Sequence, residues 1–470
     1  MAMGKRKQLQ EALFVAAEDL PRSAGHPFYQ RLNGLLAEAE FDRWIEGRCQ
    51  QYYVEEDKRG QPIIPPGLYF RMLLIGYFEG LESQRGIAWR CGDSLSLREF
   101  LGVPRDKKSP DHSTMTNTRK RLPPEVFEEV FQFVLRIADG KKLLSGKTVG
   151  VDSTLLEANA AMKSIVRRDT GEDWQEYVTR LMREEGAIDA EHQPTDEEVR
   201  RYDKNRKNKR VSNDEWVAPN DCDARIAKMK DGTTHLAYKA EHVVDLQSDL
   251  VLAAEIHPAN HSDCDTMVDS VMAAQVNLAA AGSEAMIEEV AADKGYHKTA
   301  TLELADSLDM RTYIPEPKRD HDRNWEDAPA GQQRSVYENR RRMKRDKGKR
   351  LGRLRSERVE RTFAHICDSG GARRTWLTKQ ENVTKRYLIA AAAHNLGRIL
   401  FKLIGIGKPK ALQGDMNGAE SLAERVQSAI RRLIAPLAVL AVWLARDFES
   451  DGRRAMFGPC RQNGLTSTGG

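Results

Sequence analysis

The stretch EEVAADKGYH, residues 288–297, decides the fold of the second half of this 470-residue chain. Val290, Ala291 and Ala292 form a short apolar run, typical of a buried strand, and Asp293 follows at its end. Lys294-Gly295-Tyr296 then turns the chain towards a helix that begins near Thr299. A carboxylate at the carboxyl end of a buried strand lies where α/β sheets place their chemistry. The stretch therefore predicts an α/β domain with Asp293 at its functional edge.

Two further segments carry acids in comparable settings. VGVDSTL, residues 149–155, brings Asp152 to a second predicted strand, and RSERVERTF, residues 355–363, carries Glu360 on a basic helix. Taken singly, each acid has a structural explanation as a turn acceptor, a loop residue or an arginine partner. Three carboxylates gathered at one place repel one another, so such a cluster normally needs a divalent metal.

Length and composition indicate a soluble, multidomain protein. A chain of 470 residues is expected to form two or three domains, and 40% of its residues are hydrophobic and 31% charged. The net charge is only +4, but residues 334–361 contain thirteen Lys or Arg against four Asp or Glu. This local charge suits a polyanion, or else belongs to a solvated, partly disordered segment.

Cysteine usage and hydropathy indicate a cytoplasmic protein without a membrane span. The six cysteines lie singly, with no CxxC pair, which favours a reducing compartment and argues against structural zinc. The amino terminus lacks the apolar core of a secretory signal. The longest apolar run, residues 433–445, contains Pro436 and is too short to cross a bilayer, so it predicts a buried or oligomer-forming helix.

The first third of the chain has helical periodicity. After a tail over residues 1–22, we expect an all-helical N-terminal DNA-binding domain over residues 23–145. Its last short helix, Thr114 to Leu122, has Ser113 in position to cap it and carries Arg119, Lys120 and Arg121 at its far end. This pattern fits a helix-turn-helix-like unit, and it fits equally a helical bundle with a solvated basic end.

Residues 146–400 predict a catalytic domain of the α/β class. Strand patterns over 147–155, 235–245, 250–257, 290–292 and 311–314 alternate with helices in the order that matches a ribonuclease-H-like mixed sheet. A charged insertion, about residues 163–231, interrupts it with helices at Trp174–Glu185 and Asp196–Arg210 that are DNA-facing or simply solvated. Residues 401–470 are expected to form a helical C-terminal extension and tail.

An ordered set of short motifs spans roughly residues 26–400. They are His26-Pro-Phe-Tyr, Pro65-Pro-Gly-Leu-Tyr-Phe-Arg-Met, Pro110-Asp-His-Ser-Thr, Gly150-Val-Asp-Ser-Thr, Glu157-Ala-Asn-Ala, Ala292-Asp-Lys-Gly-Tyr, Arg358-Val-Glu-Arg-Thr-Phe, Gly370-Gly-Ala-Arg-Arg and Asn395-Leu-Gly-Arg. Together they resemble the bacterial insertion-sequence transposases of the DDE superfamily, in the group with Asp-x-Gly-Tyr at the second Asp. Each motif alone is weak, but the ordered set is specific.

The resemblance implies a metal-dependent enzyme that cuts double-stranded DNA at the terminal repeats of an element and joins the freed 3′ ends to target DNA. It implies that Asp152, Asp293 and Glu360 are the catalytic triad and hold Mg²⁺ or Mn²⁺, with two ions as two-metal phosphoryl chemistry requires. It further implies a homo-oligomer assembled on DNA, acting at the nucleoid in the bacterial cytoplasm.

The chain departs from the family around the third acid. Many relatives carry a Tyr-x2-Arg-x3-Glu-x6-Lys frame, and counted from Glu360 this chain has Arg353, Ser356 and Cys367 at the other three places. Arg373 and Arg374 are the neighbouring cations that could replace the missing lysine. The DNA-binding candidates are Arg119, Lys120, Arg121, Tyr296, Arg340, Arg341, Arg342, Arg353, Arg358, Arg373 and Arg374. For Tyr296, packing beside Gly295 is the alternative to a phosphate or base contact.

Two choices remain open at this point. Arg353 stands four residues before Glu357, as the family frame asks, whereas the apolar neighbours Val359 and Phe363 favour Glu360 as the third acid. For the whole protein, the alternatives to a transposase are a ribonuclease-H-like nuclease that does not join DNA, and a DNA-binding repressor that has lost catalysis.

Overall fold

The structure of the chain is a computed structural model. It describes residues 23–53, 64–207, 211–229, 231–319, 321, 323–326 and 328–412, with residues 16 and 20. The expected tail over 1–22 and the expected C-terminal extension lie largely outside the described residues. Within the described part, residues up to Pro409 belong to one compact unit.

The N-terminal layer is helical, as the periodicity predicts, and its described residues form seven α-helices. They are α1 (Pro27–Glu38), α2 (Phe41–Cys49), α3 (Pro66–Glu79), α4 (Gln84–Asp93), α5 (Leu95–Phe100), α6 (His112–Arg121) and α7 (Pro124–Gly140). Three of them begin with proline, whose fixed φ and missing N–H suit the first helical position. Helix α3 is buried on nearly every side and is the core of this layer.

The cap of α6 differs from the prediction. Asp111, rather than Ser113, is the N-cap residue, and its Oδ1 accepts the backbone N–H of Thr114 at 2.9 Å. The Ser113 hydroxyl donates to the same oxygen at 2.8 Å. The prediction was wrong because aspartate and serine are both good capping residues, and the helix begins two residues earlier than its apolar pattern suggested.

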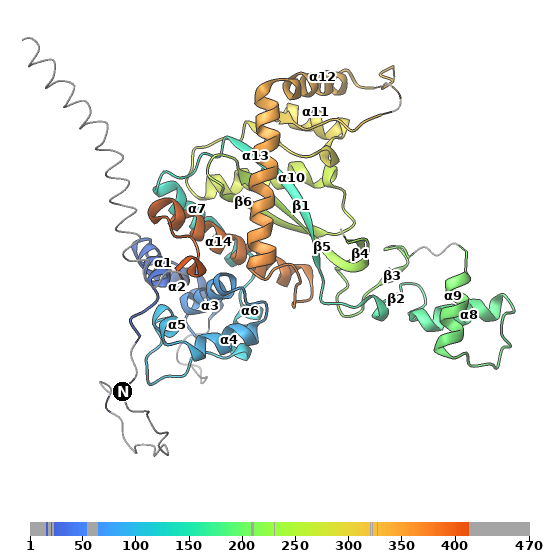
Figure 1. Cartoon of the computed structure of the whole chain (residues 1–470), viewed down its shortest axis with the longest axis horizontal. Helices are drawn as coiled ribbons and strands as arrows, with labels where there is room; N and C mark the ends of the chain where they lie inside the picture. Colours follow the sequence, from blue (N-terminus) through green and yellow to red (C-terminus); the bar gives the residue numbers. More distant parts are fainter. Residues whose placement is uncertain are drawn as a thin grey trace, which may run out of the picture. The chain divides into compact units, whose positions relative to one another are not determined.

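A mixed sheet forms the centre of the remaining chain (Figure 1). Its strands are β1 (Thr148–Glu157), β4 (Arg225–Lys228), β5 (Thr234–Asp245), β6 (Val251–Pro258), β7 (Glu289–Ala291) and β8 (Arg311–Tyr313). The order is β4-β5-β1-β7-β8, with β6 also paired to β5. Strand β1 runs antiparallel to β5 and parallel to β7, so the predicted succession of strands and helices is confirmed.

The charged insertion forms its own small lobe with β2 (Val166–Arg167), β3 (Trp216–Val217), α8 (Trp174–Glu184) and α9 (Asp196–Asn205). Val178, Met182 and Val199 are its buried core. Helix α9 has the predicted capping box but ends at Asn205, before the predicted Arg210. Because β4 already pairs with β5 in the main sheet, the insertion also closes earlier than residue 231.

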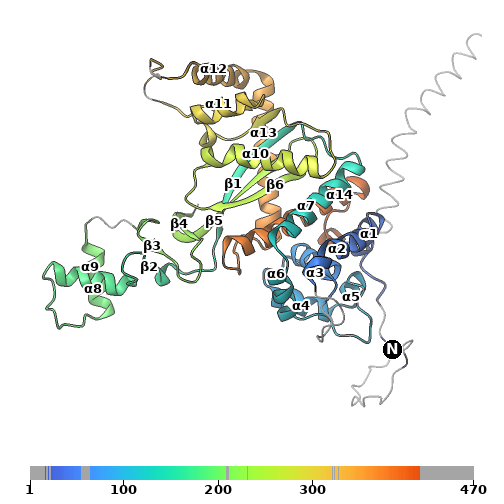
Figure 2. The ribbon, with the colours of Figure 1, turned by 180° about the vertical axis from the view of Figure 1, so that it is seen from behind.

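Helices cover the two faces of the sheet. Helix α10 (Asp263–Ala280) packs on one face, and α13 (Asp346–Phe363) crosses β1 on the other (Figures 1 and 2). The basic stretch over residues 334–361 is therefore not a loose segment. It forms most of α12 (Ala330–Lys344) and α13, while α11 (Thr299–Ser307) packs against α12.

Helix α14 (Gln380–Ile404) joins the N-terminal layer to the sheet. It packs against α3, α7 and β6, and the Asn395 amide bonds both the N–H and the C=O of Val251, at 2.9 and 2.8 Å. Within the described residues, α14 is the one helix long and apolar enough to cross a membrane, but 61% of its most apolar window is buried inside the protein. That burial is typical of a core helix in a soluble protein.

Gly150 sets how closely α13 approaches β1. A Cβ atom built there would lie 2.8 Å from Leu246 Cδ2, 2.9 Å from Val359 Cγ2 and 3.1 Å from Arg355 Cγ. All three distances are shorter than ordinary van der Waals contact, so a side chain at residue 150 would force the helix away from the strand.

We therefore expect Gly150→Ala to lower the free energy of unfolding by about 1–3 kcal/mol, the usual cost of overpacking. Urea unfolding measures it. The matched control is Gly352→Ala on α13 itself, where an added Cβ meets no atom within 4 Å. That variant should gain about 0.5–1 kcal/mol from helix propensity. Equal effects of the two substitutions would contradict the close approach.

Candidate active site

Asp152 and Asp293 lie at the same level of two neighbouring parallel strands. Gly150 of β1 pairs with Ala291 of β7, and each aspartate follows its strand's paired residue by two positions. Neighbouring strands are about 4.8 Å apart, so this register brings the two residues to one edge of the sheet. Burial of Val290 and Ala291, both 0% exposed, fixes β7 in the position that the sequence pattern predicted.

Asp152 forms an ion pair with Arg355 of α13. The distance from its Oδ2 to Arg355 Nη1 is 2.7 Å, and its Oδ1 accepts the Ser153 N–H at 2.8 Å. The Arg355 side chain is only 14% exposed, and its Nε is buried with no hydrogen-bond partner among the described residues. Arg355 thus supplies positive charge at the edge where the two aspartates meet. Sequence reasoning missed it, because it was one arginine among thirteen cations.

Asp293 caps the turn that follows β7. Its Oδ1 accepts the Gly295 N–H at 2.7 Å. A Cβ built on Gly295 would lie 2.9 Å from that oxygen and 3.4 Å from Oδ2 of Asp263, at the start of α10. Asp263 also accepts the Ser153 hydroxyl at 2.8 Å and pairs with Lys239 Nζ at 3.3 Å. A third aspartate therefore lies beside the first two.

A buried polar network supports this edge from the α10 side. Glu241 accepts the hydroxyls of Thr266, Ser270 and Tyr296 at 3.0, 2.5 and 2.9 Å. Burial raises the pKa of Glu241. Tyr296 is itself 0% exposed, so its ring packs inside the protein and its hydroxyl orients Glu241. The sequence signal was the pair Lys239 and Glu241, two charged residues at alternate positions in the middle of a predicted strand.

Glu360 and Glu357 both lie on the exposed side of α13, about one turn apart. Val359 (0% exposed) and Phe363 (6%) bury against the sheet, and Glu360 is adjacent to them, exposed, with the Ser356 hydroxyl 2.8 Å from its Oε1. Glu357 pairs with Arg361, which also contacts Asp249 in the β5–β6 turn. The structure thus brings Asp152 and Asp293 together, whereas the Glu360 carboxylate is held by its own helix.

The carboxylates have the chemistry of a divalent metal site. Asp152, Asp293 and Glu360 offer the hard oxygen ligands that Mg²⁺ and Mn²⁺ take. Among the described residues, however, no three His, Cys, Asp or Glu side chains are gathered as a ready-made metal site. Arg355 pairs with Asp152 at the position where a metal would also supply positive charge. The donor types fit a metal, although the Glu360 carboxylate accepts the Ser356 hydroxyl and Asp152 is paired with Arg355.

The basic candidates fall into two groups. Arg341 and Arg353 are exposed, as is Lys120 at the end of α6. Three others have partners: Arg340 pairs with Glu316 at 2.8 Å, Arg342 donates to the Thr312 carbonyl at 3.0 Å, and Arg358 pairs with Asp249 at 3.0 Å. Arg121 lies over the Tyr53 ring, with 5.0 Å from its Cζ to the ring centroid.

Cys367 stands where many relatives have lysine, and it is buried, 1% exposed. Nearby, Arg373 pairs with Asp368 and donates to the Thr154 hydroxyl at 3.0 Å. Arg374 stacks over the exposed Trp376, with 5.1 Å from its Cζ to the ring centroid. Of these two arginines, Arg374 is the more exposed.

Comparison with known families gives two matches along the chain. A family described as a transposase domain (DUF772) matches residues 17–121, and one described as a transposase DDE domain matches residues 181–396. The second match includes Asp293 and Glu360, whereas Asp152 precedes it. No curated protein and no solved structure matches the chain.

The fold and these matches define a DNA-processing enzyme with a ribonuclease-H-like catalytic domain. The chain belongs to the insertion-sequence transposases of the DDE superfamily. Members of this family generally depend on divalent metal, and they act on DNA.

His242 lies on β5, opposite Asp152 of β1, and connects α13 and α14 to the sheet. Its Nδ1 lies 2.7 Å from the Thr362 hydroxyl and its Nε2 2.8 Å from the Tyr387 hydroxyl, while Phe363 stacks on the ring at 4.0 Å. Burial lowers the pKa of His242 to about 3. Between the unfolded pKa, about 6.5, and this value, the unfolded chain binds a proton that the folded protein does not.

The contribution of His242 to the free energy of unfolding is therefore fully present above pH 6.5. It should fall as the pH drops, by about 1.4 kcal/mol per pH unit. His242→Gln should make the decline between pH 6.5 and 5 shallower by that amount, as measured by urea unfolding at each pH. The exposed His192 provides the control variant His192→Gln, which should leave the slope unchanged. An equal slope in wild type and His242→Gln would contradict the argument.

Proposed function

We propose that this protein is a DDE transposase that cuts the DNA at the ends of its element and transfers the freed 3′ ends to target DNA. The supporting observation is the register of β1 and β7, in which Gly150 pairs with Ala291, so that Asp152 and Asp293 follow at equivalent positions beside the helix that carries Glu360. Such a pair of carboxylates at the open edge of a mixed sheet can act on a phosphodiester bond placed against that edge.

We assign the three acids to metal binding. Asp152, Asp293 and Glu360 would hold Mg²⁺ or Mn²⁺, in two ions, which activate the attacking oxygen and stabilise the leaving oxygen of the phosphodiester. Arg355 holds the Asp152 carboxylate in place while the site is open to water, and the Glu241 network keeps β5 and Tyr296 rigid behind it. Val359 and Phe363 are buried and hold α13 against the sheet, and Glu360 follows Val359 directly on this helix.

The partner is double-stranded DNA, from the terminal repeats and the target. Exposed cations of α12 and α13, including Arg341, Lys344 and Arg353, provide the charge for its backbone. We further propose that the protein assembles as a homo-oligomer on DNA and acts in the cytoplasm, at the nucleoid.

Strand transfer is favoured over the two alternatives. A repressor would have no need for two carboxylates held in register, and a stand-alone nuclease would have no need for a helical layer joined to the sheet through α14. Both features support an enzyme that holds specific DNA ends while it acts on them.

Asp152→Asn and Asp293→Asn should each abolish Mg²⁺-dependent cleavage of element-end DNA while leaving DNA binding within about threefold, because the carboxylates serve the chemistry more than the affinity. Cleavage is measured on labelled oligonucleotides and binding by fluorescence anisotropy in EDTA. Near wild-type cleavage by either variant would refute the assignment.

The third acid has a matched comparison on the same helix. Glu360→Gln should abolish cleavage. Glu357→Gln removes only a carboxylate that is paired with Arg361 and belongs to a side chain that is 61% exposed. The reverse result, with Glu357→Gln inactive and Glu360→Gln active, would transfer the role to Glu357.

DNA affinity should fall steeply with salt. Each phosphate neutralised by a cation releases about 0.9 counterion, so the double variant Arg341→Gln, Lys344→Gln should reduce the slope of log affinity against log salt by up to about 2. Both side chains are exposed on α12, so their loss should not disturb packing. An unchanged slope would show that α12 does not touch the DNA backbone.

A further inference from the structure

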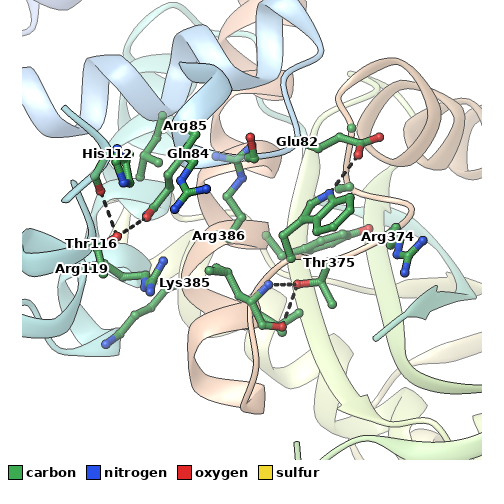
Figure 3. A pocket seen from close by; sticks show the side chains of 18 of the residues that line it. Glu82, Gln84, Arg85, His112, Thr116, Arg119, Arg374, Thr375, Lys385 and Arg386 are labelled. Carbon is green, nitrogen blue, oxygen red and sulfur yellow. Dashed lines mark hydrogen bonds between the residues drawn. The ribbon is translucent and has the colours of Figure 1, made fainter. Parts of the chain in front are cut away.

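A cavity of about 300 Å³ lies where the N-terminal layer meets the segment that follows α13 (Figure 3). Its wall combines α3, α4 and α6 with residues 371–377 and the first turns of α14. Figure 3 shows Arg386 between the side chains of α4 and α6 and those of Arg374 and Thr375. A volume of this size is at the lower end for pockets that hold a small ligand.

The cavity is strongly cationic. Its wall contains Arg85, Arg119, Arg374, Lys385 and Arg386, against a single carboxylate, that of Glu82. The Glu82 carboxylate is itself engaged, since its Oε2 accepts the indole N–H of Trp376 at 2.9 Å. Lys385 pairs with Glu381 and Arg374 lies 3.7 Å from Glu157, so these two cations are partly neutralised.

Arg119 and Arg386 are not neutralised. Among the described residues, neither has a carboxylate within ion-pair distance. Arg386 donates one hydrogen bond, to the Leu81 carbonyl at 2.8 Å, and Nε and Nη1 of Arg119 are buried without a hydrogen-bond partner. A buried guanidinium without a partner costs several kcal/mol in general, so this arrangement is expected only where an anion satisfies it.

The two guanidinium groups also repel each other. Burial, together with the smaller effect of the Arg119 charge, lowers the pKa of Arg386 to about 10. Burial likewise lowers the pKa of Arg119. An anion between them would remove both costs at once, and a phosphate matches the planar fork of arginine through paired hydrogen bonds.

An aromatic surface adjoins these cations. Trp376 is 47% exposed although it is the largest apolar side chain of the wall, and Arg374 lies over its ring. Exposed aromatic faces that flank cationic grooves are typical stacking surfaces for the bases of nucleotides. The combination is specific for a ligand that carries both a phosphate and a flat, apolar ring.

We propose that this cavity binds one nucleotide, with its phosphate between Arg119 and Arg386 and its base against Trp376. The nucleotide comes either from a DNA strand or from the free pool. In the first case the inference rests on the proposed function, because the partner is then the same DNA.

The position of the cavity relates it to the candidate active site. The extended segment at residues 373–375 is hydrogen-bonded to Glu157. The Glu157 N–H donates to the Arg373 carbonyl at 3.0 Å, and the Thr375 N–H donates to the Glu157 carbonyl at 2.9 Å. Glu157 is five residues beyond Asp152 on β1, roughly 17 Å along the strand. A DNA strand held in the cavity could therefore also reach the carboxylates.

The test is isothermal titration calorimetry of the full chain in EDTA, which prevents cleavage and so separates this inference from the proposed chemistry. The probes are deoxyadenosine 5′-monophosphate, deoxyadenosine and a short single-stranded oligodeoxynucleotide. We expect deoxyadenosine to bind roughly tenfold or more weakly than its monophosphate, because it lacks the phosphate. Arg119→Gln and Arg386→Gln should weaken binding of the phosphorylated probes by a similar factor.

Trp376→Leu and Arg105→Gln complete the design. Trp376 is exposed, so its variant should fold, bind nucleotide more weakly and bind inorganic phosphate as the wild type does. Arg105 is exposed on the loop after α5, outside the cavity wall, and Arg105→Gln is the matched control that should bind every probe normally. Thermal melting checks each variant, and the monophosphate should raise the Tm of the wild type but not that of Arg386→Gln.

The outcomes separate the two sources of the nucleotide. Tight binding of the monophosphate, lost in Arg386→Gln, identifies the free nucleotide as a ligand. Binding of the oligonucleotide alone, with the same dependence on Arg386, identifies a DNA strand. If the wild type binds neither probe, or binds both as tightly as Arg386→Gln does, the cavity is not a nucleotide site. Loss of cleavage in the aspartate variants would leave each of these results unaffected.

Discussion

The close approach of α13 to β1 at Gly150 is the constraint on which the rest of the structure depends. Because residue 150 has no side chain, Val359 and Arg355 come within van der Waals distance of the strand. This contact places Arg355 on Asp152, Leu351 on Ala291, and Thr362 and Phe363 on His242. One glycine thus aligns a helix along three strands, and the side chains of the candidate active site take their positions from that alignment.

Each carboxylate at this edge has an electrostatic or hydrogen-bonding partner. Asp152 is paired with Arg355 and Asp263 with Lys239, while Asp293 accepts a backbone N–H. Each acid therefore has a positive or hydrogen-bonding partner, which offsets their mutual repulsion. On the α10 side, Glu241 accepts the hydroxyl groups of Thr266 and Ser270 and shares Lys239 with Asp263. The edge is therefore charged but balanced.

The features that followed from the sequence are those set by local patterns. The succession of strands and helices along the chain, the helix carrying Glu360 and the capping box of α9 all depend on residues within one segment, and periodicity reveals them. The cap of α6 was misassigned because Asp111 and Ser113 are both good capping residues. The basic stretch was expected partly as a loose segment, since charge density favours solvation, but the apolar residues Val336, Leu351 and Val359 are enough to fix it as two packed helices.

Features that join distant segments could not be predicted in this way. Arg355 reaches Asp152 because Gly150, 205 positions earlier, lets α13 approach β1 closely. Neither segment contains a pattern that predicts this contact with the other. Asp263 begins an ordinary helix, and its place beside Asp293 depends on how α10 packs on β5 and β6.

The cationic cavity combines α3, α4 and α6 with residues 371–377 and α14. Because these segments are far apart in the sequence, the sequence does not show that their cations gather at one place. Arg119 and Arg374 were both recognised as basic residues, but their sequence neighbours gave no reason to connect them. The same helix α14 that joins the N-terminal layer to the sheet carries Arg386 into the cavity. Burying Arg386 and Arg119 without acids is costly for folding, and proteins retain such a cost where it supplies binding energy for a ligand. The contact between the N-terminal layer and α14 therefore has two roles: it holds the layers together, and it forms the anion site that we propose.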